Sequence, residues 1–210
     1  MGASNFVIGL LAAVPFLAQL AQVPTILLVE RLRARRLITV ASLGVSRLLL
    51  IPLALLPFLA APASAQALLI VGVGGGALLN AMSACAWNSW IHDLVPERML
   101  GAFFGRRLFY ATGFTVFIGL AAGVFVDWWG ERGIGGPAQA YTVLFLAGAL
   151  AGMASTLYLA RVPEPTMAAP ERTIHLGHML AEPFRDRNFR RLIWFLASWQ
   201  FATNLAAPFF

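Results

Sequence analysis

Six long apolar stretches alternate with short polar segments along the chain. The stretches cover residues 6–29, 37–59, 67–90, 108–126, 141–160 and 192–210. A helix needs about 20 mostly apolar residues to cross a hydrocarbon core of roughly 30 Å. The pattern therefore predicts an all-α fold, a polytopic membrane bundle of six transmembrane helices.

Prolines fall inside the first two predicted helices. Pro15 and Pro24 lie in the first, and Pro52 and Pro57 lie in the second. Because proline lacks an N–H and its ring clashes with the preceding turn, we expect both helices to be kinked.

Composition supports the membrane class and excludes others. Hydrophobic residues make up 60% of the 210 residues and charged residues only 11%, whereas a typical soluble domain has about 25% charged residues. A disordered chain is excluded, because disordered chains combine low hydrophobicity with high net charge. A disulfide scaffold is excluded because Cys85 is the only cysteine. The chain is therefore expected in the lipid bilayer.

All 15 basic residues are arginines, and the formal net charge is +6. Most of them lie in the first, third and fifth segments between the apolar stretches, whereas the second segment has no charge and the fourth has Arg132 as its one base. Arginine-rich segments stay on the cytoplasmic side of a membrane. The alternation predicts a multi-pass protein of the inner cell membrane with Met1 outside, and a topology signal in place of a nucleic-acid interface.

Four segments resemble those of the major facilitator superfamily of transporters. Residues 29–36 (Val-Glu-Arg-Leu-Arg-Ala-Arg-Arg) resemble the family's signature loop between its second and third helices. Residues 87–98 resemble the end of its fourth helix, residues 101–107 the start of its fifth, and residues 183–191 the start of its seventh.

This resemblance implies an organisation for the chain. Members of the family have twelve helices in two halves of six, joined by a long cytoplasmic loop. By register, the six stretches correspond to helices two to seven, so we expect a chain that lacks the first helix and is cut off within the seventh. The expected parts are a five-helix partial N-terminal bundle at 1–161, a cytoplasmic inter-bundle loop at 162–191 and the first helix of a truncated C-terminal bundle at 192–210.

The resemblance also implies a function. A member of the family is a secondary active transporter, a permease that moves a small solute by alternating access with an ion or proton gradient and without a cofactor. Its signature loop pairs with neighbouring cytoplasmic helix ends and helps to control gating. By resemblance, this role falls to Glu30, Arg31 and Arg35, with Asp93 and Arg98 as partners. The alternative is that these arginines only set the topology.

Polar residues at mid-membrane depth occur in four of the predicted helices. Arg47 lies about 16 Å beyond Arg36 at a rise of about 1.5 Å per residue, and ionisable residues at this depth usually face a bundle interior or a water-filled cavity. Further polar side chains share this layer: Gln19 with Gln22, Asn80 with Trp87 on its helix face, and Gln200 with Thr203 and Asn204. We expect these faces to line a substrate cavity in which Arg47 favours an anionic or carboxylate-bearing solute.

Other interpretations of these residues remain open. Gln and Asn side chains can serve only as hydrogen bonds between helices, and Arg47 can be a structural charge. The alternative function is therefore a non-transporting membrane remnant or scaffold. A membrane-embedded enzyme is disfavoured because no apolar stretch holds an Asp or Glu, and neither Gly-x-Ser-x-Gly nor His-Glu-x-x-His occurs.

The segment before the last helix has two further features. His175 and His178 lie three residues apart, but a structural zinc site needs four ligands, so no metal site is expected. Apolar residues spaced along 174–184 can form a short amphipathic helix on the membrane surface.

Overall fold

Helices connected by short turns make up the computed structural model, and it has no strand in the residues it describes, which are 5–59, 62–133, 135–167, 181 and 183–206. The predicted all-α fold is thus confirmed. The chain forms two compact units, Met1–Pro165 and Thr166–Phe210. The helices of the first unit are α1 (Asn5–Ala18), η1 (Gln19–Ala21), α2 (Gln22–Leu32), α3 (Arg35–Leu48), α4 (Leu50–Leu59), α5 (Pro62–Leu94), α6 (Glu97–Glu131) and α7 (Pro137–Leu159).

Five helical segments of the first unit are long and apolar enough to cross a membrane. They are Gly9–Leu32, Arg35–Phe58, Ser64–Leu94, Glu97–Glu131 and Pro137–Leu159. The sixth predicted stretch is also helical, as α9 (Arg187–Ala206) of the second unit. The helices are consistent with a multi-pass membrane protein.

The first membrane segment is interrupted. Between α1 and α2 the chain narrows to the 3-10 turn η1, where the N–H of Gln22 bonds to the carbonyl of Gln19. Pro24 lies four residues after Leu20 and has no N–H with which to continue the α-helical pattern there. The break therefore lies one turn before Pro24, at the carbonyl to which an N–H at position 24 would otherwise donate.

The second membrane segment has a similar break. α3 ends at Leu48 and α4 begins at Leu50. Pro52 lies four residues after Leu48 and cannot donate to its carbonyl. The Leu53 N–H reaches the Leu49 carbonyl at a long 3.4 Å, so the ladder is weakened but not lost across the break.

Helices α5, α6 and α7 extend beyond the apolar stretches that predicted them. α6 begins directly after Pro96 and has Glu97 in its first turn, where a carboxylate is favoured by the helix dipole. Arg98, Arg106 and Arg107 consequently lie on a helix and not in a loop, which corrects the sequence-based boundary. The hydropathy pattern marks only the lipid-embedded part of a helix, whereas α6 has 35 residues and is about 52 Å long.

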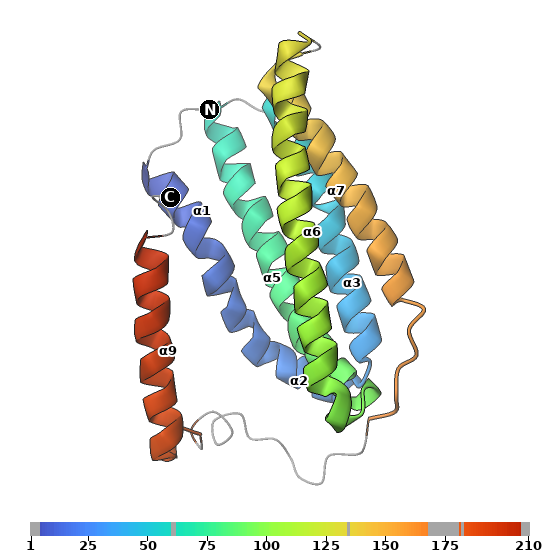
Figure 1. Cartoon of the computed structure of the whole chain (residues 1–210), viewed down its shortest axis with the longest axis vertical. Coiled ribbons are helices and arrows are strands. Elements are labelled where there is room, and N and C mark those ends of the chain that lie inside the picture. Colours follow the sequence, from blue (N-terminus) through green and yellow to red (C-terminus); the bar gives the residue numbers. More distant parts are fainter. Residues whose placement is uncertain (1–4, 60–61, 134, 168–180, 182, 207–210) are drawn as a thin grey trace. The chain divides into compact units, whose positions relative to one another are not determined.

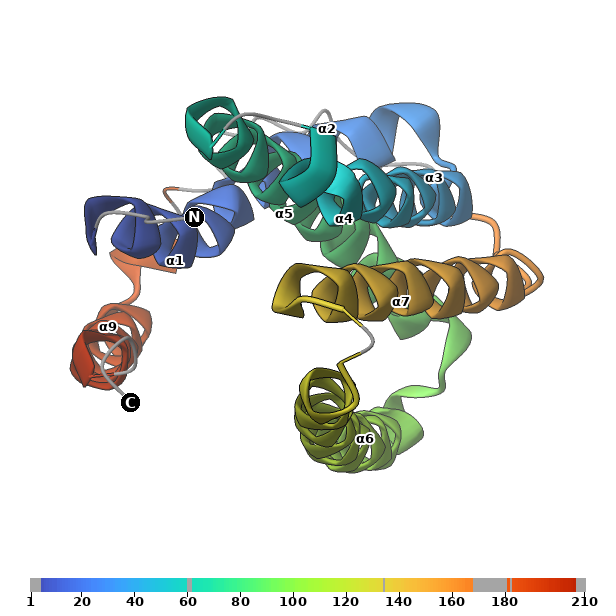
Figure 2. The same ribbon diagram turned by 90° about the horizontal axis from the view of Figure 1, so that it is seen from above.

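The first unit is built around α5, which packs on α1, α2, α3 and α4. Figure 1 shows α5 and α3 running side by side, and Figure 2 shows α7 between α6 and the group formed by α3, α4 and α5. Close helix packing relies on small residues. A Cβ at Gly72 of α5 would lie only 2.6 Å from Leu53 Cδ2, so this glycine lets α4 and α5 approach each other.

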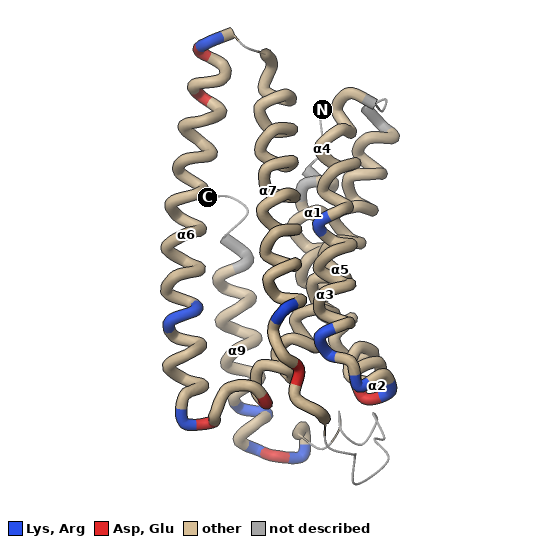
Figure 3. The backbone as a smooth tube through the Cα atoms, turned by 90° about the vertical axis from the view of Figure 1, so that its right-hand side faces the viewer, with Lys and Arg blue, Asp and Glu red and all other residues tan. Residues whose placement is uncertain are grey.

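Charged residues gather at one end of the first unit (Figure 3). At this end α2, α5 and α7 finish and α3 and α6 begin; we call it the charged end. The opposite end has a smaller group on the last turns of α6. The arrangement matches the alternation of arginine-rich segments in the sequence.

The second unit is described for η2 (Pro183–Arg185) and α9. Asp186 precedes α9, and its Oδ1 accepts the Asn188 N–H at 2.7 Å, as an N-terminal cap does. The helix therefore starts five residues earlier than the predicted stretch at 192. Of the predicted amphipathic helix at 174–184, residues 181, 183 and 184 are described, whereas His175 and His178 lie outside the described residues.

Candidate functional site

A cavity of about 350 Å³ lies where the two interrupted membrane segments meet α5 and α7. Three predicted residues line it: Gln19 from η1, Arg47 from α3 and Asn80 from α5. Most of the remaining wall is apolar, and it includes Leu49, Leu50, Leu53, Leu69, Val73 and Phe145. Separate helices therefore bring these polar groups to one place.

Arg47 is a cation at this cavity, and it has no ion-pair partner among the residues that the structure describes. Its side chain crosses Gly152 of α7, where an added Cβ would lie 2.5 Å from Arg47 Cδ and 2.8 Å from Nε. The Nε atom is buried and unbonded, and no acidic side chain pairs with Arg47 in the described part of the chain. α3 places Arg47 about 18 Å from Arg35 at the charged end, a depth at which an unpaired charge is costly.

Asn80 is held in a fixed orientation by the polar groups around it. Its Nδ2 donates to the Gly76 carbonyl at 2.8 Å and to Ser46 Oγ at 3.0 Å. Since a carbonyl can only accept, the amide nitrogen must face Gly76. Ser46 is the neighbour of Arg47 in α3, so this network also fixes the α3–α5 contact beside the cavity.

The two glutamines of the first membrane segment contact each other. Gln22 Nε2 donates to Gln19 Oε1 at 2.5 Å, and Gln19 Nε2 donates to the Pro15 carbonyl at 3.4 Å. Gln22 does not line the cavity. Its backbone carbonyl instead accepts the Cys85 thiol of α5 at 3.7 Å. The pair therefore spans the break at η1 and positions Gln19 at the cavity.

Trp87 of α5 faces a different neighbour from Asn80. Trp87 does not line the cavity. The guanidinium carbon of Arg107 lies over the Trp87 ring, 4.4 Å from the ring centre, and the ring packs edge-on against Phe104. Two turns beyond Asn80, α5 thus faces α6. Gln200 is on α9 of the second unit, and the Asn204 side chain lies outside the described residues.

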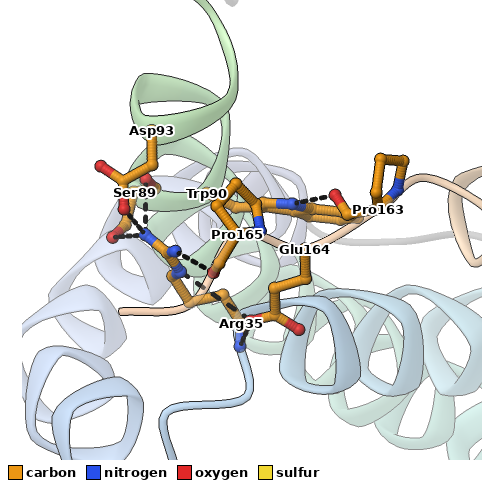
Figure 4. A network of polar contacts seen from close by, with 7 residues as sticks. All are labelled: Arg35, Ser89, Trp90, Asp93, Pro163, Glu164 and Pro165. Atoms are coloured by element: carbon orange, nitrogen blue, oxygen red, sulfur yellow. Dashed lines mark hydrogen bonds and ion pairs between the residues drawn. The ribbon is translucent and has the colours of Figure 1, made fainter. Parts of the chain in front are cut away.

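Arg35 forms the centre of a second polar cluster, at the charged end (Figure 4). The Arg35 side chain is only 1% exposed. Its Nη1 donates to Asp93 Oδ2 at 2.5 Å and to the Ser89 carbonyl at 3.0 Å, and its Nη2 donates to the Pro165 carbonyl at 3.1 Å. One guanidinium thus joins α3, the last turns of α5 and the segment that follows α7.

Glu164 and Trp90 complete this cluster. Glu164 Oε1 accepts the Arg35 backbone N–H at 2.6 Å and lies 3.9 Å from Arg35 Nε. Trp90 is fully buried, and its Nε1 donates to the Pro163 carbonyl at 3.0 Å. We call these seven residues the Arg35 clasp: Arg35, Ser89, Trp90, Asp93, Pro163, Glu164 and Pro165.

The local backbone places Arg35 in the clasp. Arg33 ends α2 in the left-handed conformation, with φ at 48°, and its N–H bonds to the Val29 carbonyl at 2.8 Å. The connection to α3 is therefore only two residues long, and Arg35 begins α3 beside α5. Within the described residues Asp93 pairs with Arg35, whereas Glu30, Arg31 and Arg98 form no ion pair.

A second cavity of about 370 Å³ adjoins the first. Leu53, Leu69 and Phe145 line both cavities. The second one continues past Pro57 of α4 and Tyr141 of α7, towards the end opposite the charged end. At the charged end the Arg35 and Trp90 side chains of the clasp are buried, and a third cavity of about 530 Å³ lies between the end of α5 and the first turns of α6.

Several residues of these clusters were not among the sequence-based candidates. Glu164 and Trp90 belong to the clasp, and Gly152 and Ser46 border Arg47. The signal for Glu164 was its position between Pro163 and Pro165, four residues after the end of an apolar stretch. Gly152 had no distinguishing signal among the glycines of its helix.

Comparisons with family models, with curated proteins and with solved structures found no match to this chain. Within the described residues, no three His, Cys, Asp or Glu side chains cluster as metal ligands would.

Proposed function

We propose that this protein is a permease of the major facilitator type, which moves a small solute across the inner cell membrane by alternating access and is driven by an ion or proton gradient. The resemblance of four segments to that family motivates the proposal. Five helices able to cross a membrane are consistent with it.

The cavity around Arg47 is the main support. Transporter sites lie near the bilayer midplane and are formed where membrane helices are discontinuous. Here the breaks at η1 and at Leu49 both border the cavity. Its polar groups come from separate helices, so a relative movement of these helices would change the site. The unpaired Arg47 favours an anionic solute, because opposite charge offsets the cost of a cation at this depth.

The Arg35 clasp supports a gate at the charged end. It joins three segments through a buried guanidinium, and the Arg47 cavity with the cavity adjoining it extends from there towards the other end. We assign Arg35 and Asp93 to gating, with Glu164 as their additional partner. Glu30, Arg31 and Arg98 flank the clasp in sequence and would take part only in another conformation.

The full chain reconstituted into liposomes tests the proposal. Uptake of labelled small carboxylates, and of their uncharged amides as controls, is measured with an imposed proton or sodium gradient. We expect uptake of at least one carboxylate that stops when an ionophore abolishes the gradient, is lost in Arg47→Gln and persists in the surface variant Arg36→Gln. A protein that is inserted and folded, yet transports no member of the set, contradicts the proposal.

A further inference from the structure

Some hydrogen-bonding groups of the Arg47 cavity already have partners within the protein, and others do not. Both N–H groups of the Asn80 amide are engaged, by Gly76 and Ser46. Gln19 donates one amide N–H to the Pro15 carbonyl at 3.4 Å, and its Oε1 accepts from Gln22 of the same membrane segment. No described donor reaches Asn80 Oδ1. The cavity therefore offers a ligand donors, from Arg47 and from the second N–H of Gln19, and an acceptor that no described donor uses, the oxygen of Asn80.

The described lining of the cavity carries positive charge and no negative charge. Among the described residues that line the cavity, Arg47 alone is ionisable. The apolar stretches that supply the lining, at 6–29, 37–59, 67–90 and 141–160, contain no Asp or Glu. One positive charge in an apolar surrounding matches a ligand with one negative charge. A dianion would leave its second charge without a cationic partner among the described lining residues.

The walls define the remainder of the ligand. Leucines at 49, 50, 53 and 69, with Val73 and Phe145, form most of the surface beyond the polar groups. A volume of about 350 Å³ is at the small end of ligand pockets, which range over roughly 300–1,000 Å³. An apolar ring or branched chain fits this surface, whereas a sugar would leave many hydroxyls unbonded.

We infer that the Arg47 cavity binds a compact monocarboxylate with an apolar body and one hydroxyl or amine donor. Its carboxylate pairs with Arg47, its donor bonds to Asn80 Oδ1, and its apolar part lies against the leucines and Phe145. This inference rests on the proposed function for its physiological meaning, because it names the class of solute that the permease would carry.

Binding to the purified full chain in lipid nanodiscs tests the inference, with mandelate as the probe. Mandelate has a phenyl ring, one carboxylate and one hydroxyl. We expect saturable binding by calorimetry, about tenfold weaker for phenylacetate, which lacks the hydroxyl, and none for mandelamide or for the dianion succinate. Equal binding of mandelate and mandelamide would overturn the inference, and this comparison needs no variant.

Variants then locate the site. Arg47→Gln should abolish mandelate binding, whereas Arg36→Gln, an exposed arginine one residue after the clasp's Arg35, should leave it unchanged. Asn80→Ala should reduce the preference for mandelate over phenylacetate to about one. Binding that survives Arg47→Gln excludes this cavity.

The two experiments distinguish failure of the permease proposal from failure of the inference about the ligand. Uptake of other solutes without mandelate binding would leave the permease proposal standing and refute the inference. Mandelate binding without any transport would do the reverse.

Discussion

Replacing Arg35 with Gln should loosen the segment that follows α7. In the native clasp the guanidinium donates to the Ser89 and Pro165 carbonyls and to the Asp93 carboxylate. Gln is shorter and carries two donors on one nitrogen, so it cannot reach all three acceptors. The Pro165 carbonyl would lose its partner, and with it the tie between α3 and the following segment.

The size of the effect follows from burial. Breaking a fully buried ion pair costs about 3–5 kcal/mol, but the Asp93 side chain is 50% exposed and can be rehydrated. The two carbonyls contribute about 1 kcal/mol each. We therefore expect Arg35→Gln to lower the free energy of unfolding by about 2–4 kcal/mol. Asp93→Asn should cost only about 1 kcal/mol, because solvent screens an exposed charge.

Two measurements check this prediction. Unfolding in mixed micelles gives the difference in stability, and trypsin cleavage after Arg161 reports release of the segment after α7. Cleavage after Arg132, in the α6–α7 connection, is the internal reference. Arg36→Gln is the matched control and should change stability by less than about 0.5 kcal/mol. If Asp93→Asn costs as much as Arg35→Gln, or if cleavage after Arg161 does not accelerate, the buried guanidinium is not what holds the clasp.

Three further changes test the packing around the two clusters. Gly152→Ala should displace Arg47, weaken mandelate binding and cost about 1–3 kcal/mol; Gly148→Ala, which has no neighbour within 4 Å of its Cβ position, should be neutral or slightly stabilising in the same assays. Phe145→Ala should join the two cavities and speed mandelate association in stopped-flow fluorescence, and an unchanged rate would show that the ligand enters by another route. Trp90→Phe removes one buried hydrogen bond and should cost about 1 kcal/mol with faster tryptic cleavage after α7, whereas native cleavage kinetics would mean that this bond does not retain the segment.

The positions of the membrane helices could be predicted because lipid imposes one simple requirement, a long apolar stretch. The boundaries could not, since a helix continues for as long as its backbone is bonded and capped. α6 illustrates this: Pro96 and Glu97 start it well before the apolar stretch at 108. Pro24 and Pro52 predicted interruptions in these two helices, but a proline in the sequence does not determine at which residue the helix is interrupted.

The candidate site could be predicted as far as depth alone determines it. Counting residues from the arginine clusters placed Gln19, Arg47 and Asn80 at one level, and all three line one cavity. Helix-face periodicity did not extend to Trp87, because α5 meets a different neighbour two turns further on. The return of Glu164 to Arg35 is a contact across 129 positions of the chain, and no local pattern in the sequence encodes it.

The breaks and the unpaired arginine are best understood together. Irregular backbone at membrane depth is tolerated only where protein covers it or where it lines a polar cavity. Pro24 and Pro52 interrupt two neighbouring segments, and both interruptions border the cavity that holds Arg47. A hydrated cavity would supply partners for the backbone groups released at the breaks and would solvate the guanidinium when no anion is bound. A helix break or an unpaired arginine alone would be destabilising in lipid. Because they lie side by side, one polar cavity serves both, and a bound carboxylate would occupy that cavity.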